Sequence, residues 1–167
     1  MKFMWMLVLP VVLLSGCQSG ASQATIDLMD ATTKQSIELY SVWSAQKDNV
    51  VASMPTEQAM FESAIADISG TLQLISLGCQ NFNAALQAKS SLSVNSASKI
   101  SDAVATLETL KRVMVQFGGR ITAKDEAQKE AIEVWKMQCI ENTSTLIMLF
   151  NRLDSSVQTD LAKAQSN

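Results

Sequence analysis

The side chains with the widest chemical reach in this sequence are three cysteines, Cys17, Cys79 and Cys139, in a chain of 167 residues that has no histidine. A thiol can be acylated, oxidised to a disulfide or used as a nucleophile. Without histidine, no Ser-His-Asp or Cys-His pair can activate a nucleophile and no imidazole can hold a metal. No two cysteines have the C-x-x-C spacing of redox enzymes. We therefore predict attachment and structural pairing for the cysteines, and no catalysis.

Carboxylates are the second group that could do chemistry, and they gather at Asp125, Glu126, Glu130 and Glu133. Acid–base catalysis would need such groups in hydrogen-bond reach of a substrate. Their spacing instead places them on the outer face of a helix, where neighbouring lysines ease their mutual repulsion. The chain also lacks a glycine-rich phosphate loop. We predict a solvated face here, with no metal site, no cofactor and no enzymatic activity.

The overall charge argues against a nucleic-acid partner. The chain carries a net charge of -3, whereas binding a phosphate backbone requires a basic face. The basic residues Lys111, Arg112, Arg120 and Lys124 form only a modest patch, which we interpret as ordinary charged surface. A length of 167 residues with 47% hydrophobic content supports one compact domain.

The first 17 residues have the composition of an export signal. Lys2 is followed by an uncharged run from Phe3 to Leu14, which is too short for a membrane span of about 20 residues. The run ends in Leu14-Ser15-Gly16-Cys17. This motif resembles the lipobox of bacterial lipoproteins, in which an aliphatic residue and two small residues precede a cysteine. The alternative is an ordinary signal peptide or N-terminal anchor that contains a cysteine.

The resemblance implies where the protein is held. In bacterial lipoproteins the signal is cut before the cysteine, so residues 1–16 would be removed and Cys17 would carry acyl chains such as palmitate. Two or three chains give stable membrane anchoring, whereas one is marginal. Gln18 stands where an Asp commonly retains lipoproteins in the inner membrane, which implies sorting to the outer membrane, facing the periplasm. Loss of Lys2 leaves 12 basic and 16 acidic residues, a net charge of -4.

The rest of the chain predicts a helical domain on a short tether. Residues 18–24 are small and polar and predict a flexible link between Cys17 and a helical bundle at 25–167. Few glycines and prolines follow, which favours helices. Amphipathic segments are expected near 25–53, 56–89, 98–117 and 122–163. They indicate an all-α, antiparallel four-helix bundle. The alternative is a three-helix bundle with the first segment as an arm.

Apolar residues in steps of three and four mark the faces that we expect to be buried, as in a coiled coil. The second segment has the longest run: Phe61, Ile65, Ile68, Leu72, Ile75, Cys79, Phe82 and Leu86. The third has Ile100, Ala103, Leu107, Leu110, Met114 and Phe117. The fourth has Ile132, Trp135, Cys139, Leu146, Leu149, Leu153 and Val157, and Thr122 with Asp125 resembles a capping box before it.

The first segment has the weakest pattern of the four. Its apolar positions are Ile26, Met29, Ile37, Tyr40, Val51 and Met54. Three polar residues, Thr33, Ser44 and Lys47, interrupt this stripe. The weakness is the reason for keeping the arm as an alternative.

Cys79 and Cys139 are expected on the buried faces of the second and fourth segments, which run parallel in an up-down bundle. Counting residues from the turns places the two sulfur atoms within about 10 Å in height. Because exported proteins meet an oxidising compartment, we predict a disulfide, worth roughly 4 kcal/mol for a loop of about 60 residues. The alternative is a pair of buried free thiols that pack as small hydrophobes.

Together these features predict a lipid-anchored envelope protein that acts as a non-enzymatic interaction or scaffold module at the membrane surface. Its partners would be the membrane, through acylated Cys17, and another envelope protein. The alternative is a helical bundle that binds a small apolar ligand such as a lipid. That reading requires a closed apolar pocket of at least about 300 Å³.

Overall fold

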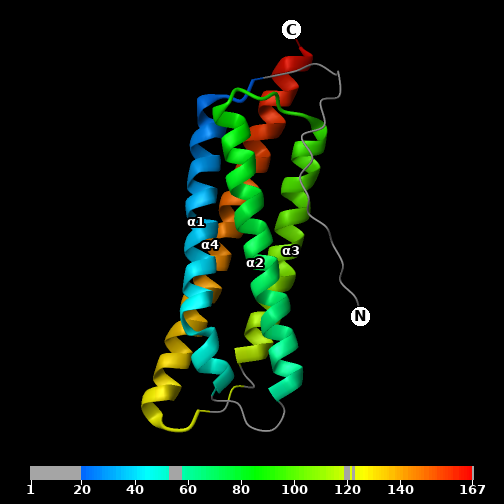
Figure 1. Cartoon of the computed structure of the whole chain (residues 1–167). Coiled ribbons are helices and arrows are strands. Elements are labelled where there is room, and N and C mark those ends of the chain that lie inside the picture. The colour runs from blue at the N-terminus through cyan, green and yellow to red at the C-terminus, as the bar shows by residue number, and fades with distance from the viewer. Residues whose placement is uncertain (1–19, 53–57, 119–120, 122, 167) are drawn as a thin grey trace.

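The computed structural model describes residues 20–52, 58–118, 121 and 123–166. These residues form four helices: α1 (Gln23–Ala52), α2 (Gln58–Gln87), α3 (Val94–Gly118) and α4 (Glu126–Gln165). Figure 1 shows the helices running up and down side by side, so the predicted all-α four-helix bundle is confirmed. The start of α1, the α2–α3 connection and the end of α4 lie at the same end of the bundle (Figure 1).

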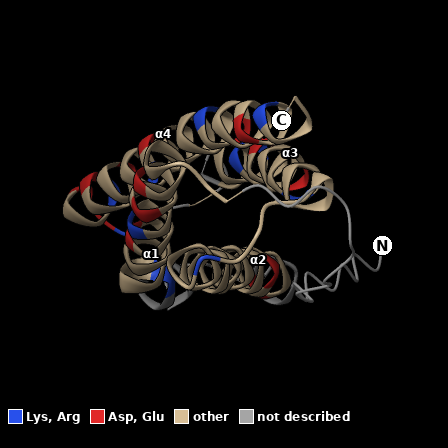
Figure 2. Cartoon of the chain, turned by 90° about the horizontal axis from the view of Figure 1, so that it is seen from above, with Lys and Arg blue, Asp and Glu red and all other residues tan. Residues whose placement is uncertain are grey.

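The helices pack in the spatial order α2, α1, α4, α3. The pairs that come into close contact along their lengths are α1 with α2, α1 with α4, and α3 with α4. Seen along the bundle, α1 and α2 lie on one side and α4 and α3 on the other (Figure 2). Because α1 packs against two helices, it belongs to the bundle and is not an arm.

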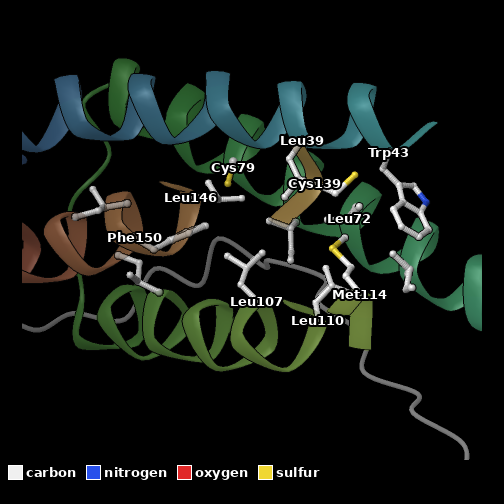
Figure 3. Close-up of a cluster of buried hydrophobic side chains, with 14 of the residues drawn as sticks. Leu39, Trp43, Leu72, Cys79, Leu107, Leu110, Met114, Cys139, Leu146 and Phe150 are labelled. Carbon is white, nitrogen blue, oxygen red and sulfur yellow. The ribbon is translucent and has the colours of Figure 1, made fainter. Parts of the chain in front are cut away.

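The predicted apolar faces of α2 and α3 are buried, except that Phe82 and Ala103 are only partly buried. Ile68, Leu72 and Cys79 of α2 are each at most 3% exposed, and Leu107 of α3 is fully buried. Figure 3 shows Leu72, Leu107 and Leu110 pointing into one shared core. The side chain of Phe61, which begins the predicted run on α2, lies outside the described residues.

The buried face of α1 differs from the predicted one. Its buried positions follow steps of four and three: Thr25, Met29, Thr32, Ser36, Leu39 and Trp43. Half of these residues carry a hydroxyl group. Ile37, which we expected to be buried, is 45% exposed, and Thr33, which we read as an interruption, is buried. Steps of four and three therefore do continue through α1, in residues that a search for apolar side chains overlooks.

Hydroxyl groups can occupy this face because the helix itself satisfies them. Thr32 Oγ1 donates to the Leu28 carbonyl oxygen at 2.7 Å, and Ser36 Oγ donates to that of Thr33 at 2.7 Å. A buried hydroxyl without a partner would cost about 1–3 kcal/mol, and these bonds avoid that cost.

Two tryptophans connect α1 to its neighbours α2 and α4. The rings of Trp43 in α1 and Trp135 in α4 lie 5.0 Å apart between centroids. Trp43 Nε1 donates to Ser69 Oγ of α2 at 2.8 Å, and Trp135 Nε1 donates to the Val42 carbonyl oxygen of α1 at 3.1 Å. Both indole N–H groups are thus paired, as buried indoles require.

The start of α4 is capped three residues later than predicted. The N-cap is Asp125, whose Oδ1 accepts from the Gln128 backbone N–H at 2.8 Å. The Gln128 side chain reaches back and accepts from the Lys124 N–H at 2.6 Å, which resembles a capping box. Thr122, the predicted cap, lies outside the described residues.

The buried face of α4 is slightly shifted from the predicted one, since Phe150 is buried and Leu149 is only half-buried.

Gly70 offers a test of the packing of α2. A Cβ built at this position would meet no atom within 4 Å, so the glycine does not serve a close helix contact. Gly70→Ala should raise the free energy of unfolding by about 0.5–1 kcal/mol, because alanine favours the helix, and should raise Tm by roughly 2–4 °C. Thermal unfolding followed by far-UV circular dichroism measures this. Leu72→Ala, in the core, should lose about 2–5 kcal/mol; a destabilised Gly70→Ala variant would contradict the packing described here.

Candidate functional site

The predicted lipidation site, Cys17, lies outside the described residues, which begin at Gly20. Helix α1 begins at Gln23, two residues before the expected start, and Ser22 caps it: Ser22 Oγ accepts from the Thr25 N–H at 3.3 Å. Only residues 18–22 therefore separate Cys17 from the first turn of the helix. Five residues span at most about 17 Å, so an anchor at Cys17 would hold this end of the bundle close to it.

A carboxylate of α4 fixes the first turn of α1. Asp160, which is 6% exposed, accepts from the Ser22 backbone N–H at 2.8 Å and from the Thr25 hydroxyl at 2.6 Å. The Thr25 hydroxyl also lies 2.7 Å from that of Ser156. A negative charge at a helix N-terminus is favoured by the unpaired N–H groups there. This junction joins the beginning of the domain to its end.

The same contacts set the ionisation of Asp160. Burial alone would raise the pKa of its carboxyl group, but the hydrogen bonds from Thr25 and Ser22 and the charge of Lys163 outweigh burial and lower the pKa. The ionised form is thus the one that the fold stabilises.

The disulfide predicted between Cys79 and Cys139 is not present in the structure. Both cysteines are free and buried. Burial raises the pKa of Cys79 to about 11, partly opposed by a hydrogen bond from Ser36, and raises the pKa of Cys139 to about 12. Both residues are thus protonated and unreactive at neutral pH.

The helix order explains why the cysteines do not meet. Thr33 of α1 donates to the Cys79 carbonyl oxygen at 3.3 Å, which places Cys79 level with Thr33. The bond from Trp135 to Val42 places Cys139, four residues further along α4, level with about residue 38 of α1. The two cysteines thus differ in height by about 7 Å, and α1 packs between their helices. Figure 3 shows the two sulfur atoms apart in the core. A disulfide needs Cα atoms within about 7 Å of each other.

The carboxylates that begin α4 lie on the exposed surface, as predicted. Glu126 pairs with Lys129 at 3.1 Å, and Glu133 pairs with Lys136. Within the described parts of the chain, no three Cys, Asp or Glu residues come together in a way that could hold a metal ion. Of the predicted basic patch, Lys111 is half-buried, Arg112 donates to Thr109 at 3.2 Å, and Arg120 lies outside the described residues.

The outer face of α4 carries a second repeat that the sequence reasoning missed. Three large apolar residues are half exposed there: Val134 at 50%, Met137 at 56% and Met148 at 51%. They belong to a stripe in steps of four and three that we call the outer stripe: Glu130, Val134, Met137, Glu141, Ser144, Met148, Arg152 and Ser155. The stripe lies opposite the buried face of the same helix. The sequence signal for the outer stripe is a second repeat in steps of four and three within the same segment. It is harder to recognise because the buried face of this helix has a more strongly apolar repeat.

The surface is hollowed along one half of the outer stripe. A depression of about 640 Å³ lies between α4 and Leu28 of α1, and it is largely open to solvent. Its lining is mixed apolar and polar: Leu28, Ser144, Ile147, Met148, Asn151, Arg152 and Ser155. Its shape suits side chains that dock from outside, in contrast to the closed apolar pocket that the ligand-binding alternative requires.

The charged side chains of the outer stripe have no partners among the described residues. Glu130, Glu141 and Arg152 make no hydrogen bond or ion pair with any residue that the structure describes. They recur at intervals of 11 residues, which is three helical turns and keeps them on one face. Between residues 126 and 141, α4 has four glutamates and two lysines, so this part of its surface is acidic.

Comparison of the chain with known protein families, curated proteins and solved structures finds no match. In the described part of the chain, none of the helices is long and apolar enough to cross a bilayer. A function has to be argued from the N-terminal motif and from the surface of α4.

The Asp160 junction predicts a dependence of stability on pH. Because folding lowers the pKa of Asp160 below its ordinary value of 3.8, its contribution is complete above about pH 5 and is lost as the pH falls through the folded pKa. Asp160→Asn should therefore cost about 1–2 kcal/mol at pH 7, and this cost should shrink towards pH 3. Urea unfolding at several pH values measures it. The exposed Asp102→Asn variant should change stability by less than about 0.5 kcal/mol throughout; a pH-independent loss in Asp160→Asn would contradict an ionised junction.

The free cysteines predict a pattern of thiol reactivity. In a Cys17→Ser chain without reductant, Ellman's reagent should label neither remaining cysteine in the native protein, because both are buried and have raised pKa values. In denaturant, the absorbance of the same sample should correspond to two reactive thiols for each chain. Fewer than two thiols before reduction would mean that the cysteines pair.

Proposed function

We propose that this chain is a bacterial envelope lipoprotein that acts as a non-enzymatic interaction module at the membrane surface. The observation that carries the proposal is the motif Leu14-Ser15-Gly16-Cys17 at the end of a short apolar segment that begins with Lys2. In this proposal the signal is removed, Cys17 is acylated, and the outer membrane is the destination because Gln18 follows the cysteine.

The geometry of the bundle supports anchoring at one end. Helix α1 begins at Gln23, six residues after Cys17, and the Asp160 junction connects this start to the end of α4. A helix of 40 residues is about 60 Å long. A bundle held at this end would project its opposite end, and much of the outer face of α4, away from the lipid.

The surface supports a protein contact over the alternative of an enclosed apolar ligand. The hollow beside α4 is open, and its lining includes three polar side chains and Arg152. Half-exposed apolar residues flanked by charges are typical of docking faces for helices. A catalytic role has less support, because the chain has no histidine and the carboxylates that begin α4 are exposed.

Lipid labelling tests the anchor. Cells that express the full chain should incorporate radioactive palmitate into it, and globomycin, an inhibitor of the lipoprotein signal peptidase, should cause a precursor to accumulate. Cys17→Ser should reduce the label to background, whereas Cys79→Ala should keep it, because Cys79 is buried in the core. An unlabelled wild-type chain, or processing that globomycin does not affect, would refute the lipobox interpretation.

Fractionation of a Gram-negative host tests the destination. The wild-type chain should sediment with the outer membrane. Gln18→Asp should move most of it to the inner-membrane fraction, since Asp is the residue that commonly retains lipoproteins there. Equal distribution of the two variants would show that residue 18 does not direct the chain.

A further inference from the structure

We infer that the outer stripe of α4 is the docking surface for a basic amphipathic helix of a partner protein. The inference rests on the proposed function, since it names the surface and the chemistry of the partner that the interaction module would use. Three features of the stripe support it: its apolar residues, its unpaired charges and its direction relative to the anchor.

The apolar residues provide the contact. Val134, Met137 and Met148 are each at least half exposed, and the stripe repeats in the steps that allow two helices to pack along their lengths. Methionine suits such a surface because its flexible, polarisable side chain adapts to a partner. The open depression around Met148 would receive the partner's side chains at that level.

The charges define the chemistry of the partner. Lys129 and Lys136 pair with Glu126 and Glu133, so no lysine or arginine in the described part of the chain pairs with Glu130 or Glu141. Covering Glu130 and Glu141 with an apolar or acidic surface would remove two unpaired charges from water, which opposes binding. A partner helix must therefore bring Lys or Arg to these two positions.

The stripe changes sign at its other end. Arg152 lies 11 residues beyond Glu141 and has no partner among the described residues. A complementary helix is thus basic over two of these three positions and acidic at the third, which fixes its direction along α4.

A second copy of this chain does not meet these requirements. Two copies anchored in one membrane would have to pack their stripes in parallel, which sets Glu130, Glu141 and Arg152 against like charges. Antiparallel packing centred on Glu141 could bring Glu130 of one copy to Arg152 of the other, but it would set the two Glu141 side chains against each other. It would also place the two anchors at opposite ends of helices about 60 Å long. The occupant is therefore a different chain.

The test uses the full lipidated chain in cells. A photo-crosslinking amino acid, p-benzoylphenylalanine, replaces Met137 or Met148 in the stripe, or Leu77 as a control. Leu77 is on α2 and 46% exposed, so it matches the stripe residues in character and accessibility. Palmitate labelling of each variant checks its anchoring, and resistance to limited proteolysis checks its fold.

We expect an adduct from Met137 and Met148 at least about fivefold stronger than from Leu77. Mass spectrometry of the adduct should identify a segment with Lys or Arg spaced to meet Glu130 and Glu141. Glu130→Lys combined with Glu141→Lys should reduce the yield at least about fivefold, because it reverses the charges that attract the partner, whereas Glu126→Lys combined with Lys129→Glu, which keeps the net charge, should leave it unchanged.

Four results would overturn the inference: no adduct from either stripe position in a folded chain, equal adducts from Leu77, a yield that the charge reversal does not change, or an adduct with a second copy of the chain. Palmitate labelling separates these from failure of the anchor. A labelled chain without an adduct refutes the docking surface alone, whereas an unlabelled chain refutes the proposed function.

Discussion

Packing of a hydroxyl-rich helix between two apolar ones is the constraint on which the arrangement of this bundle depends. Helix α1 contacts both α2 and α4, yet Thr25, Thr32 and Ser36 occupy half of the heptad positions on its buried face. These side chains bury less apolar area than leucine and so contribute less to stability. Their burial costs little only because they donate hydrogen bonds to the helix backbone or to Asp160. Specific polar contacts must then fix the position of α1 along its neighbouring helices, which apolar packing does for the other helices.

Those contacts lie towards the two ends of α1. At its start, Asp160 binds the first turn through Ser22 and Thr25. Towards its other end, Trp43 and Trp135 stack and donate to α2 and to α1. Since both sets include α4, they fix the height and rotation of α4 relative to α1. In the proposed orientation this carries over to the outer stripe: Met148 and Met137 lie about 25 and 40 Å along α4 from its C-terminal end. A partner would thus meet them at defined heights above the membrane.

Sequence reasoning succeeded where one local pattern determines the outcome. The apolar repeats of α2 and α3 predicted most of their buried faces, because each repeat continues along most of its helix. On α1 the same rule failed, since it counts Thr32 and Ser36 as polar although the backbone satisfies them. The structure also does not contain the predicted Cys79–Cys139 disulfide, for another reason. Residue counts give height along a bundle, but they do not show that α1 packs between α2 and α4. The Asp160 junction joins residues 138 positions apart, and no local signal marks it.

The two faces of α4 show how charge decides which of two repeats becomes the core. Both follow steps of three and four, but one contains Trp135, Leu146 and Phe150, and the other contains Glu130 and Glu141. Among the residues that the structure describes, no cation pairs with those two carboxylates. Burying them would therefore cost more free energy than burial of Val134 and Met137 would provide. The outer stripe must therefore face water in the free protein. The same energetics selects its partner, because only a helix that carries complementary charges can cover the apolar residues without stranding the carboxylates.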